Sequence, residues 1–497
     1  MKFFSRKSRK YSRLMKRLFL IIFTVIFACC VYFIFYPPIL LTDNWCTNNK
    51  LRDNISCGEE SLITTTEGKT GFGNFNDGLK HFKDRKWQQA VVSFAKQRED
   101  KDAQNNPEIL IYLNNAKLMQ EKRKTYTIAV ALPIRVAEVF LRGVAQVQEE
   151  FNIKNPGLGL KVLIVNDEND NKKVPGLVDT LLSKDDVVAV IGHYASEVTQ
   201  AALPAYQNKQ VVVISPGSAA MRETILNGKT YPTNFFFRTV PNVKTVHRIL
   251  IDKLKLSQLA SGEKVAVFYN PNSTYSKSAF EEFGRQLEVN KIIGVDISSP
   301  NFIPNNSLMA VKKEGAKALI LIPDGHITAA SDAFNNALSL IDFNKDELPI
   351  GGYSVLYDPN ILTRRDIARV KKLVLVISWH RLTSPNQAVI TQAKNLWGTG
   401  DISDKTAMSY DATLVLTEAL KKIAKTDNVK TQRLDIQKQL TDLAVTAGAS
   451  GNISFENGDR KEEIYETVKV VPIPNQCSKY GAMFVPISYD VTKLPCK

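Results

Sequence analysis

The sequence predicts an α/β protein with two lobes, each built on a parallel β-sheet that is covered by helices. From Thr125 onward, short runs rich in valine and isoleucine alternate with amphipathic stretches, which is the pattern of strands connected by helices. Each run is hydrophobic without interruption, so both faces of each strand should be buried. About 370 residues follow this pattern, and this is more than one hydrophobic core usually holds.

The first 17 residues form a basic tail. They contain eight lysine and arginine side chains and no acidic one, in a chain of net charge +15. The other 480 residues carry the remaining +7 without a basic run, as an ordinary solvated surface does. The charge pattern therefore predicts no nucleic-acid partner.

Residues 18–41 contain no charged side chain and are predicted to form a transmembrane helix. A helix of this length would extend roughly 36 Å, which exceeds the ~30 Å hydrocarbon core of a bilayer. Since basic residues are retained on the cytoplasmic side, the tail should be inside and the bulk of the chain outside, in the periplasm. Two alternatives stay open: a cleaved signal peptide, or a lipoprotein with its lipid on Cys29.

The polar residues 42–72 are predicted to form a linker. Four cysteines outside the apolar segment occur as two local pairs, Cys46 with Cys57 and Cys477 with Cys496. Thiols oxidise outside the cytoplasm, so each pair is expected to form a disulfide bond, with four free thiols as the alternative. The sequence contains no CxxC motif and no cysteine–histidine cluster, so we expect no metal site and no cofactor.

Residues 73–122 are predicted to form a helical segment. Gly78, Trp87, Ala90 and Phe94 have the spacing of the small and large packing positions of a tetratricopeptide repeat. The stretch 107–122 would add a helix with a proline in its first turn. One such unit cannot bury its own apolar face, so we expect it to dock on a neighbouring part of the chain.

The remainder, residues 123–497, is predicted to contain the α/β lobes. The hydrophobic runs predict seven strands, at 126–132, 160–166, 187–192, 210–215, 264–269, 317–322 and 372–378. Amphipathic stretches between them predict four helices, at 139–152, 196–208, 275–290 and 327–341.

Small and hydroxyl-bearing residues follow two neighbouring strands. The turn 192–195 follows the strand 187–192, and Ser196 is expected to be the N-cap of the next helix. The turn 215–220 follows the strand 210–215. Ligands bind beyond the carboxyl ends of parallel strands, and helix N-termini attract anions, so a carboxylate-bearing ligand would fit here. The alternative is a pair of ordinary strand–helix turns that need glycine and serine for geometry alone.

Residues 187–220 resemble the first-lobe pocket of the type I periplasmic binding proteins, specifically the leucine/isoleucine/valine-binding family of ABC importers. Six further stretches resemble the family in the right order, so that the resemblance extends from 125 to about 471. They are 141–152, 160–171, 235–242, 264–283, 407–420 and 448–460.

The resemblance implies two lobes that are joined by three crossovers and close on a ligand. Lobe one would comprise about 125–240 and 374–446, and lobe two about 241–373 and 447–497. By position, Tyr275 would close over the ligand from lobe two, and Ser196 would hold an amino-acid carboxylate. The rest of the first-lobe wall would be Tyr194, Ala195, Gly217, Ser218 and Ala219.

The sequence departs from the family at three points of the expected pocket, the first of which is the short loop 133–138 after the first strand. Ala219 stands where the family often has a hydroxyl, which Ser218 could supply instead. Amino-acid binders of the family offer a second-lobe carboxylate to the ammonium group, and this chain has Tyr353 near that point. Either Asp324 or Asp358 takes the role, or the ligand is not an amino acid, because a buried ammonium without a carboxylate is costly.

The expected function is that of a membrane-tethered receptor that captures a small polar ligand, such as an amino acid or amide, for ABC permease subunits. The alternative is a non-transport protein of the same fold, either a sensor or a regulator of envelope enzymes. The sequence contains no nucleophile elbow, P-loop or zinc signature, so we expect no enzymatic activity.

Overall fold

The computed structural model describes residues 46, 54–63, 73–184, 186–230, 234–325, 332–363, 370–426, 428–474 and 477–494. The predicted tail at 1–17, the membrane segment at 18–41 and most of the linker at 42–72 lie outside these ranges. In the part that is described, no helix has both the length and the apolarity to cross a membrane. The chain divides into two units, Met1–Asn48 and Asn49–Lys497, and the second contains every helix and strand discussed below.

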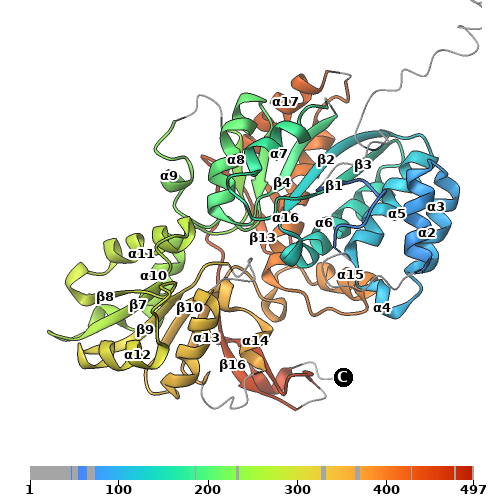
Figure 1. The fold of residues 1–497 in the computed structure, drawn as a ribbon. Coiled ribbons are helices and arrows are strands. Elements are labelled where there is room, and N and C mark those ends of the chain that lie inside the picture. The colour runs from blue at the N-terminus through green and yellow to red at the C-terminus, as the bar shows by residue number, and fades with distance from the viewer. Residues whose placement is uncertain are drawn as a thin grey trace, which may run out of the picture. The chain divides into compact units, whose positions relative to one another are not determined.

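The first lobe is built on a six-stranded sheet in the order β1-β3-β2-β4-β5-β6 (Figure 1). All neighbours are parallel except β1, which pairs antiparallel with β3 at the edge of the sheet. The strands are β1 Ile55–Ser56, β2 Lys124–Leu132, β3 Leu158–Asn166, β4 Val187–Gly192, β5 Val212–Ser215 and β6 Phe236–Arg238.

The second lobe is built on a seven-stranded sheet in the order β17-β16-β11-β10-β9-β7-β8. Strands β16 and β17 add antiparallel to its edge, so both sheets are mixed rather than purely parallel as expected. The strands are β7 Lys264–Tyr269, β8 Ile292–Asp296, β9 Ala316–Ile322, β10 Ile350–Tyr353, β11 Leu373–Ile377, β16 Glu466–Pro472 and β17 Ala482–Pro486.

Helices cover both faces of the second sheet, as the uninterrupted hydrophobic strands predict. Successive residues of a strand point to opposite faces. Leu319 and Leu321 of β9 therefore join one hydrophobic cluster, while Ile320 joins the other. The first cluster includes helices α12 Pro304–Lys313 and α13 Asp332–Asn344, and the second includes α10 Val243–Lys253 and α11 Thr274–Gln286.

The first lobe has its own set of helices. They are α6 Ile134–Lys154, α7 Val174–Leu181, α8 Ser196–Asn208, α9 Arg222–Ile225, α15 Gln387–Trp397, α16 Asp404–Lys422 and α17 Val429–Asp442. Helices α6 and α16 cross closely at Gly143, where a Cβ atom would lie 2.2 Å from the carbonyl oxygen of Thr406. This glycine lets the first turn of α16 pack against the middle of α6, beside the site described below.

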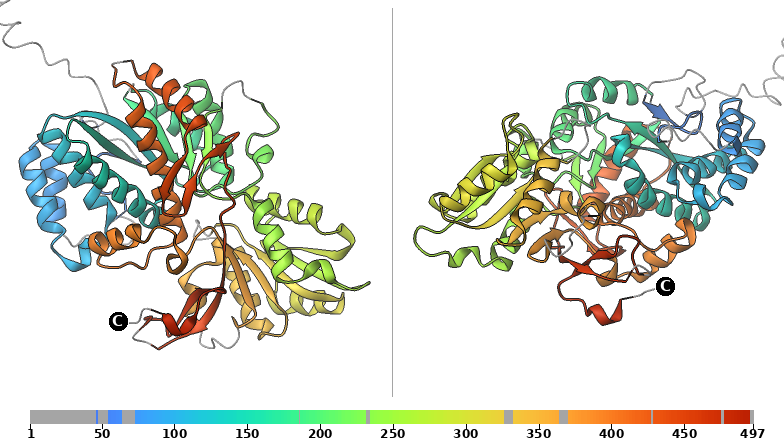
Figure 2. Two further views of the ribbon diagram at one scale, coloured as in Figure 1. Left: turned by 180° about the vertical axis from the view of Figure 1, so that it is seen from behind. Right: turned by 60° about the horizontal axis from the view of Figure 1, so that its bottom comes forward.

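The chain passes between the sheets near 240, near 378 and near 461 (Figure 2). Strand β11 belongs to the second sheet, so the chain returns to lobe one after residue 377 rather than at the expected 374. Two short hairpins, β12 Val445–Gly448 with β13 Gly451–Ile453 and β14 Phe455–Glu456 with β15 Asp459–Arg460, still pack on lobe one. The third crossing therefore lies after these hairpins and not at 447.

Short elements complete the described chain. In lobe two they are α14 Pro359–Leu362 and the 3₁₀ turns Leu256–Gln258, Val289–Lys291, Ser354–Leu356 and Val491–Lys493. A further 3₁₀ turn, Arg381–Thr383, follows the second crossing and contacts β17. Cys46, Cys57 and Cys477 are each disulfide-bonded, so these three are not free thiols. Cys496 lies outside the described residues, and the pairing of the cysteines stays a prediction.

The predicted helical segment at 73–122 folds as α2 Gly73–Lys83, α3 Trp87–Gln97, α4 Lys101–Gln104 and α5 Pro107–Gln120. Helices α2 and α3 pack against each other at Gly78, where a Cβ atom would lie 2.4 Å from the Phe94 ring. The relationship to a tetratricopeptide repeat stays a prediction. Helix α5 packs on α6 and β3 of lobe one (Figure 1), and this contact buries most of its length.

Asn115 fastens α5 to the edge of the first sheet. Its Nδ2 donates to the carbonyl oxygens of Val162 and Cys57, at 2.8 Å in each case, and its Oδ1 accepts from the Val162 N–H at 3.1 Å. The Asn115 amide therefore takes the place of a neighbouring strand at this point of β3. The helical segment is part of lobe one and not a separate module.

We expect Asn115→Leu to destabilise the protein by about 2–4 kcal/mol, because it leaves buried backbone groups of β3 without partners. Asn114→Leu is the matched control, because Asn114 is equally buried while its Nδ2 has no partner among the described residues. Its replacement should change stability by less than about 1 kcal/mol. Chemical denaturation of both variants checks the pair, and equal losses would contradict the role given to Asn115.

Candidate functional site

Strand β4 ends in a tight turn that leads into the site. Gly192 has a φ of +147°, and a Cβ atom there would lie 2.3 Å from the carbonyl oxygen of Ala131, so only glycine fits. The next residue, His193, is fully buried. Its Nδ1 lies 2.6 Å from Oδ2 of Asp167 and its Nε2 lies 3.0 Å from the Tyr206 hydroxyl. This network fixes the backbone that presents Tyr194.

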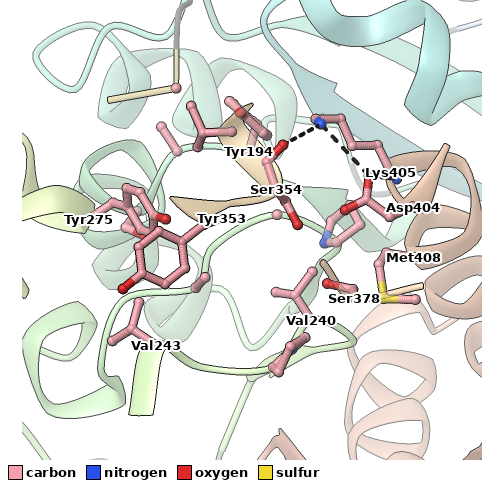
Figure 3. Close-up of a pocket in the computed structure, with 18 of the residues that line it drawn as sticks. Tyr194, Val240, Val243, Tyr275, Tyr353, Ser354, Ser378, Asp404, Lys405 and Met408 are labelled. Carbon is pink, nitrogen blue, oxygen red and sulfur yellow. Dashed lines mark hydrogen bonds and ion pairs between the residues drawn. The ribbon is translucent and has the colours of Figure 1, made fainter. Parts of the chain in front are cut away.

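A cavity of about 90 Å³ lies beyond the carboxyl ends of the strands and is lined by both lobes (Figure 3). A single water needs only about 10–15 Å³, so the cavity has room for a small organic molecule. Figure 3 shows Val243, Tyr275 and Tyr353 on one side and Asp404, Lys405 and Met408 on the other. Seven of the nine predicted ligand-binding residues line it: Tyr194, Ala195, Ser196, Gly217, Ala219, Tyr275 and Tyr353.

Ser196 lines the cavity, but it is not the N-cap of the helix. Helix α8 begins at Ser196 itself, its N-cap is Ala195, and no side chain caps it. The Ser196 hydroxyl instead accepts hydrogen bonds from the Ser218 hydroxyl at 3.1 Å and the Ala220 N–H at 3.3 Å. The prediction of a serine cap was wrong because Ser196 finds its partners in the loop that follows the next strand.

Ser218 and Asp324 do not line the cavity. Ser218 is fully buried behind Ser196, so it does not replace the hydroxyl that Ala219 lacks. The Oδ2 atom of Asp324 accepts a hydrogen bond from Asn270 at 2.6 Å, and the neighbouring Gly325 is the residue at the cavity wall. Asp358, the other expected carboxylate, caps α14 by accepting from the Asn360 N–H.

Sequence reasoning missed the contribution of helices α6 and α16. Phe140, Asp404, Lys405 and Met408 line the cavity from these helices. The Nζ atom of Lys405 donates to the carbonyl oxygen of Ser354 in lobe two at 3.3 Å and lies 3.8 Å from Oδ1 of Asp404. The stretch 407–420 resembles the family, but nothing in the sequence at Asp404 and Lys405 predicts contact with a ligand.

Glu197, the second residue of α8, is a further polar residue that sequence reasoning missed. It lines the cavity, and its Oε2 has no hydrogen-bond partner in the part of the chain that the structure describes. Burial raises the pKa of Glu197, and the charge of Asp324 raises it further. Because an unpaired buried carboxylate is costly, Glu197 is suited to pair with a donor group of a ligand.

Tyrosines and serines supply further polar groups at the cavity wall. Burial raises the pKa of Tyr194, Tyr275 and Tyr353, so all three stay protonated at neutral pH. The Tyr353 hydroxyl has no partner among the described residues. Most other lining side chains are apolar, including Phe140, Val240, Val376 and Met408. The arrangement suits a ligand with an apolar body and a small polar head.

Metal ions are held in proteins by groupings of ligand side chains. Within the described ranges of the chain, no group of three or more histidine, cysteine, aspartate or glutamate side chains is placed to hold a metal ion.

The part of the chain that forms the cavity matches a known protein family. Residues 136–470 match the model of a family described as periplasmic binding protein. This match covers about two thirds of the chain and includes all the described residues that line the cavity. No curated protein matches the chain in sequence.

Several solved structures share the fold at low sequence identity. A leucine-bound ABC transporter substrate-binding protein from Desulfitobacterium hafniense is 19% identical, with a TM-score of 0.57, over 73% of this chain and 100% of that one. The isoleucine-bound LivJ from Streptococcus pneumoniae is 15% identical, with a TM-score of 0.57 and the same coverage. A Rhodopseudomonas palustris solute-binding protein in complex with 3,4-dihydroxybenzoic acid is 16% identical, with a TM-score of 0.55, over 75% of this chain and 99% of that one.

Proposed function

Because this chain belongs to the periplasmic binding protein family, we propose that it is an extracytoplasmic solute-binding protein that captures a small molecule for an ABC importer. The observation that carries the proposal is the cavity, which takes Tyr194 from one lobe and Tyr275 from the other. A ligand that contacts both lobes stabilises the conformation in which they are close together. Membership of this family also places the chain among non-enzymatic proteins.

The cavity chemistry supports a ligand with an apolar body and a polar head. Its apolar lining and its few polar groups are typical of small-molecule sites. The structural relatives bind leucine, isoleucine or 3,4-dihydroxybenzoic acid, which all combine an apolar part with a polar group. We propose a ligand of comparable size for this chain.

The predicted membrane helix at 18–41 would tether the protein beside its permease. Tethering raises the effective concentration of the receptor at the permease without any new contact. The basic tail at 1–17 would then be cytoplasmic, in agreement with the positive-inside rule.

A regulator or sensor of the same fold is the second candidate. The helical segment α2–α5 favours it, since the segment lies outside the residues 136–470 that match the family model. An extra layer of helices on lobe one is a surface that solute capture does not require. The two candidates predict different behaviour toward small molecules.

Thermal-shift screening of the full-length protein in detergent tests the proposed function. Amino acids, amides, amines, aromatic acids, sugars and short peptides form the screen. A true ligand at 100 times its dissociation constant should stabilise the folded protein by about 2.7 kcal/mol. If no small molecule raises the melting temperature, the receptor proposal fails and the regulator is favoured.

A further inference from the structure

The charges at the cavity are unbalanced. Among the described lining residues, Glu197 and Asp404 are acidic and Lys405 is the one basic side chain. Lys405 lies 3.8 Å from Asp404 and so offsets its charge. Glu197 has no basic partner within the described ranges, and its Oε2 has no hydrogen bond there. The net charge of the described side chains that line the cavity is therefore −1 when Glu197 is ionised.

Several carboxylates also act on the Tyr194 hydroxyl at the cavity wall. Its pKa is raised first by burial, and then by the carboxylates of Asp404, Glu197, Asp324 and Asp358. Four acidic groups thus act on one phenol at the cavity wall. A negative potential favours a cationic ligand and disfavours an anionic one.

The N-terminus of α8 does not attract a ligand carboxylate strongly enough to overcome this negative charge. The partial positive charge of a helix N-terminus stabilises acidic groups in the first turn. Glu197 already occupies that turn, so the helix start holds an anion supplied by the chain itself. A second carboxylate beside Glu197 would be repelled.

Uncharged groups of the cavity agree with an ammonium-bearing ligand. Tyr353 is 4% exposed and lines the cavity, and its hydroxyl has no partner among the described residues. Its oxygen can accept a hydrogen bond from a ligand N–H. The apolar walls from Phe140, Val240 and Met408 suit an uncharged body.

Resting on the proposed function, we infer that the cavity takes a small cation, a protonated amine on an otherwise uncharged apolar body, with Glu197 as its counter-ion. Leucinamide and isopentylamine have this chemistry. Leucine carries the same amine together with a carboxylate, and 4-methylpentanoate carries the carboxylate without the amine. These four compounds share one branched apolar body, so they isolate the effect of charge.

Isothermal titration of the full-length protein with the four compounds tests the inference. We expect leucinamide and isopentylamine to bind more tightly than leucine, and 4-methylpentanoate not to bind at millimolar concentration. Glu197→Gln keeps the size of the side chain and removes its charge, so it should weaken the two amines by roughly 10- to 100-fold. Glu223→Gln is the matched control, since Glu223 is an exposed residue of lobe one outside the cavity, and it should leave both affinities unchanged.

Three outcomes would overturn the inference. The first is 4-methylpentanoate binding as tightly as the amines, and the second is unchanged amine affinity in Glu197→Gln. Both leave the proposed function intact, because a small molecule still binds. The third is that none of the four compounds binds. In that case the wider screen tests the proposed function separately, because a sugar, aromatic acid or peptide that binds would still support a solute-binding protein.

Discussion

Replacement of Arg238 by methionine is expected to destabilise the protein by about 3–5 kcal/mol, because it breaks a buried ion pair. The Arg238 side chain is fully buried, with its Nε 2.9 Å from Oδ1 and its Nη2 2.6 Å from Oδ2 of Asp459. It also donates to the carbonyl oxygens of Ser218 and Ala220. One guanidinium therefore joins the β5–α9 loop at the cavity to the β14–β15 hairpin near the third crossing.

Arg248→Met provides the matched control for this prediction. Arg248 forms an ion pair with Glu463, but the two side chains are 54% and 59% exposed. Exposed pairs contribute at most about 0–1 kcal/mol, so this variant should unfold at nearly the wild-type denaturant concentration. Similar losses in the two variants would show that burial of Arg238 does not matter.

The effect of Arg238→Met should also depend on pH. Burial raises the pKa of Asp459, but the charges and hydrogen bonds of Arg238 and Arg222 outweigh it and lower the pKa below its usual value. When the pKa of an aspartate is lower in the folded state than in the unfolded state, its ionised form stabilises the folded protein. This stabilisation is fully present at pH values above the unfolded pKa of about 3.9, and it is lost as the pH falls through the folded pKa. The difference between variant and wild type should therefore shrink below about pH 4. Denaturation curves at pH 7 and pH 3 check the sign.

His193→Leu is expected to cost about 3–5 kcal/mol, because it leaves the buried Asp167 carboxylate without its partner. The Tyr206 hydroxyl loses its hydrogen bond to the ring in the same change. Since His193 directly precedes Tyr194, we also expect weaker binding of any ligand that touches Tyr194. Chemical denaturation measures the first effect and titration calorimetry the second.

A second substitution separates loss of the hydrogen-bond partner from loss of packing. Asp167→Asn removes the charge while retaining an oxygen that can accept from the Asn169 N–H, as Oδ1 of Asp167 does at 3.0 Å. The double variant His193→Leu with Asp167→Asn should thus be more stable than His193→Leu alone. If the double variant is less stable, the stranded carboxylate is not the source of the loss.

The sequence predicts the long hydrophobic strands well and the short strands poorly, whether they lie at the edge or in the middle of a sheet. All seven predicted strands are present, because uninterrupted runs such as 187–192 are buried on both faces. Strand β10, with the sequence IGGY, was missed because two of its four residues are glycine. A Cβ atom at Gly352 would lie 2.6 Å from Leu356 and 3.0 Å from Leu375, so close packing from elsewhere in the chain requires that glycine.

The candidate site was predictable where it depends on strand ends and not where it depends on helix packing. Tyr194 and Gly217 follow strands directly, so sequence position alone places them at the cavity. Asp404 and Lys405 begin a helix more than 180 residues further along the chain and reach the cavity because α16 packs on α6. Nothing local in the sequence distinguishes them from an ordinary first helical turn.

The central claim is that a small molecule binds between the two sheets, and a variant that fills the cavity tests it most directly. Ala219 lines the cavity, while its backbone oxygen accepts from the Val243 N–H at 2.9 Å, so Ala219→Trp adds an indole there and keeps the backbone bond. Titration calorimetry with a ligand from the screen should show one site per chain in the wild type. The Ala219→Trp variant should lose binding while its melting temperature stays unchanged, which shows that the variant is folded. Equal affinity in both proteins would place the ligand elsewhere and contradict the account.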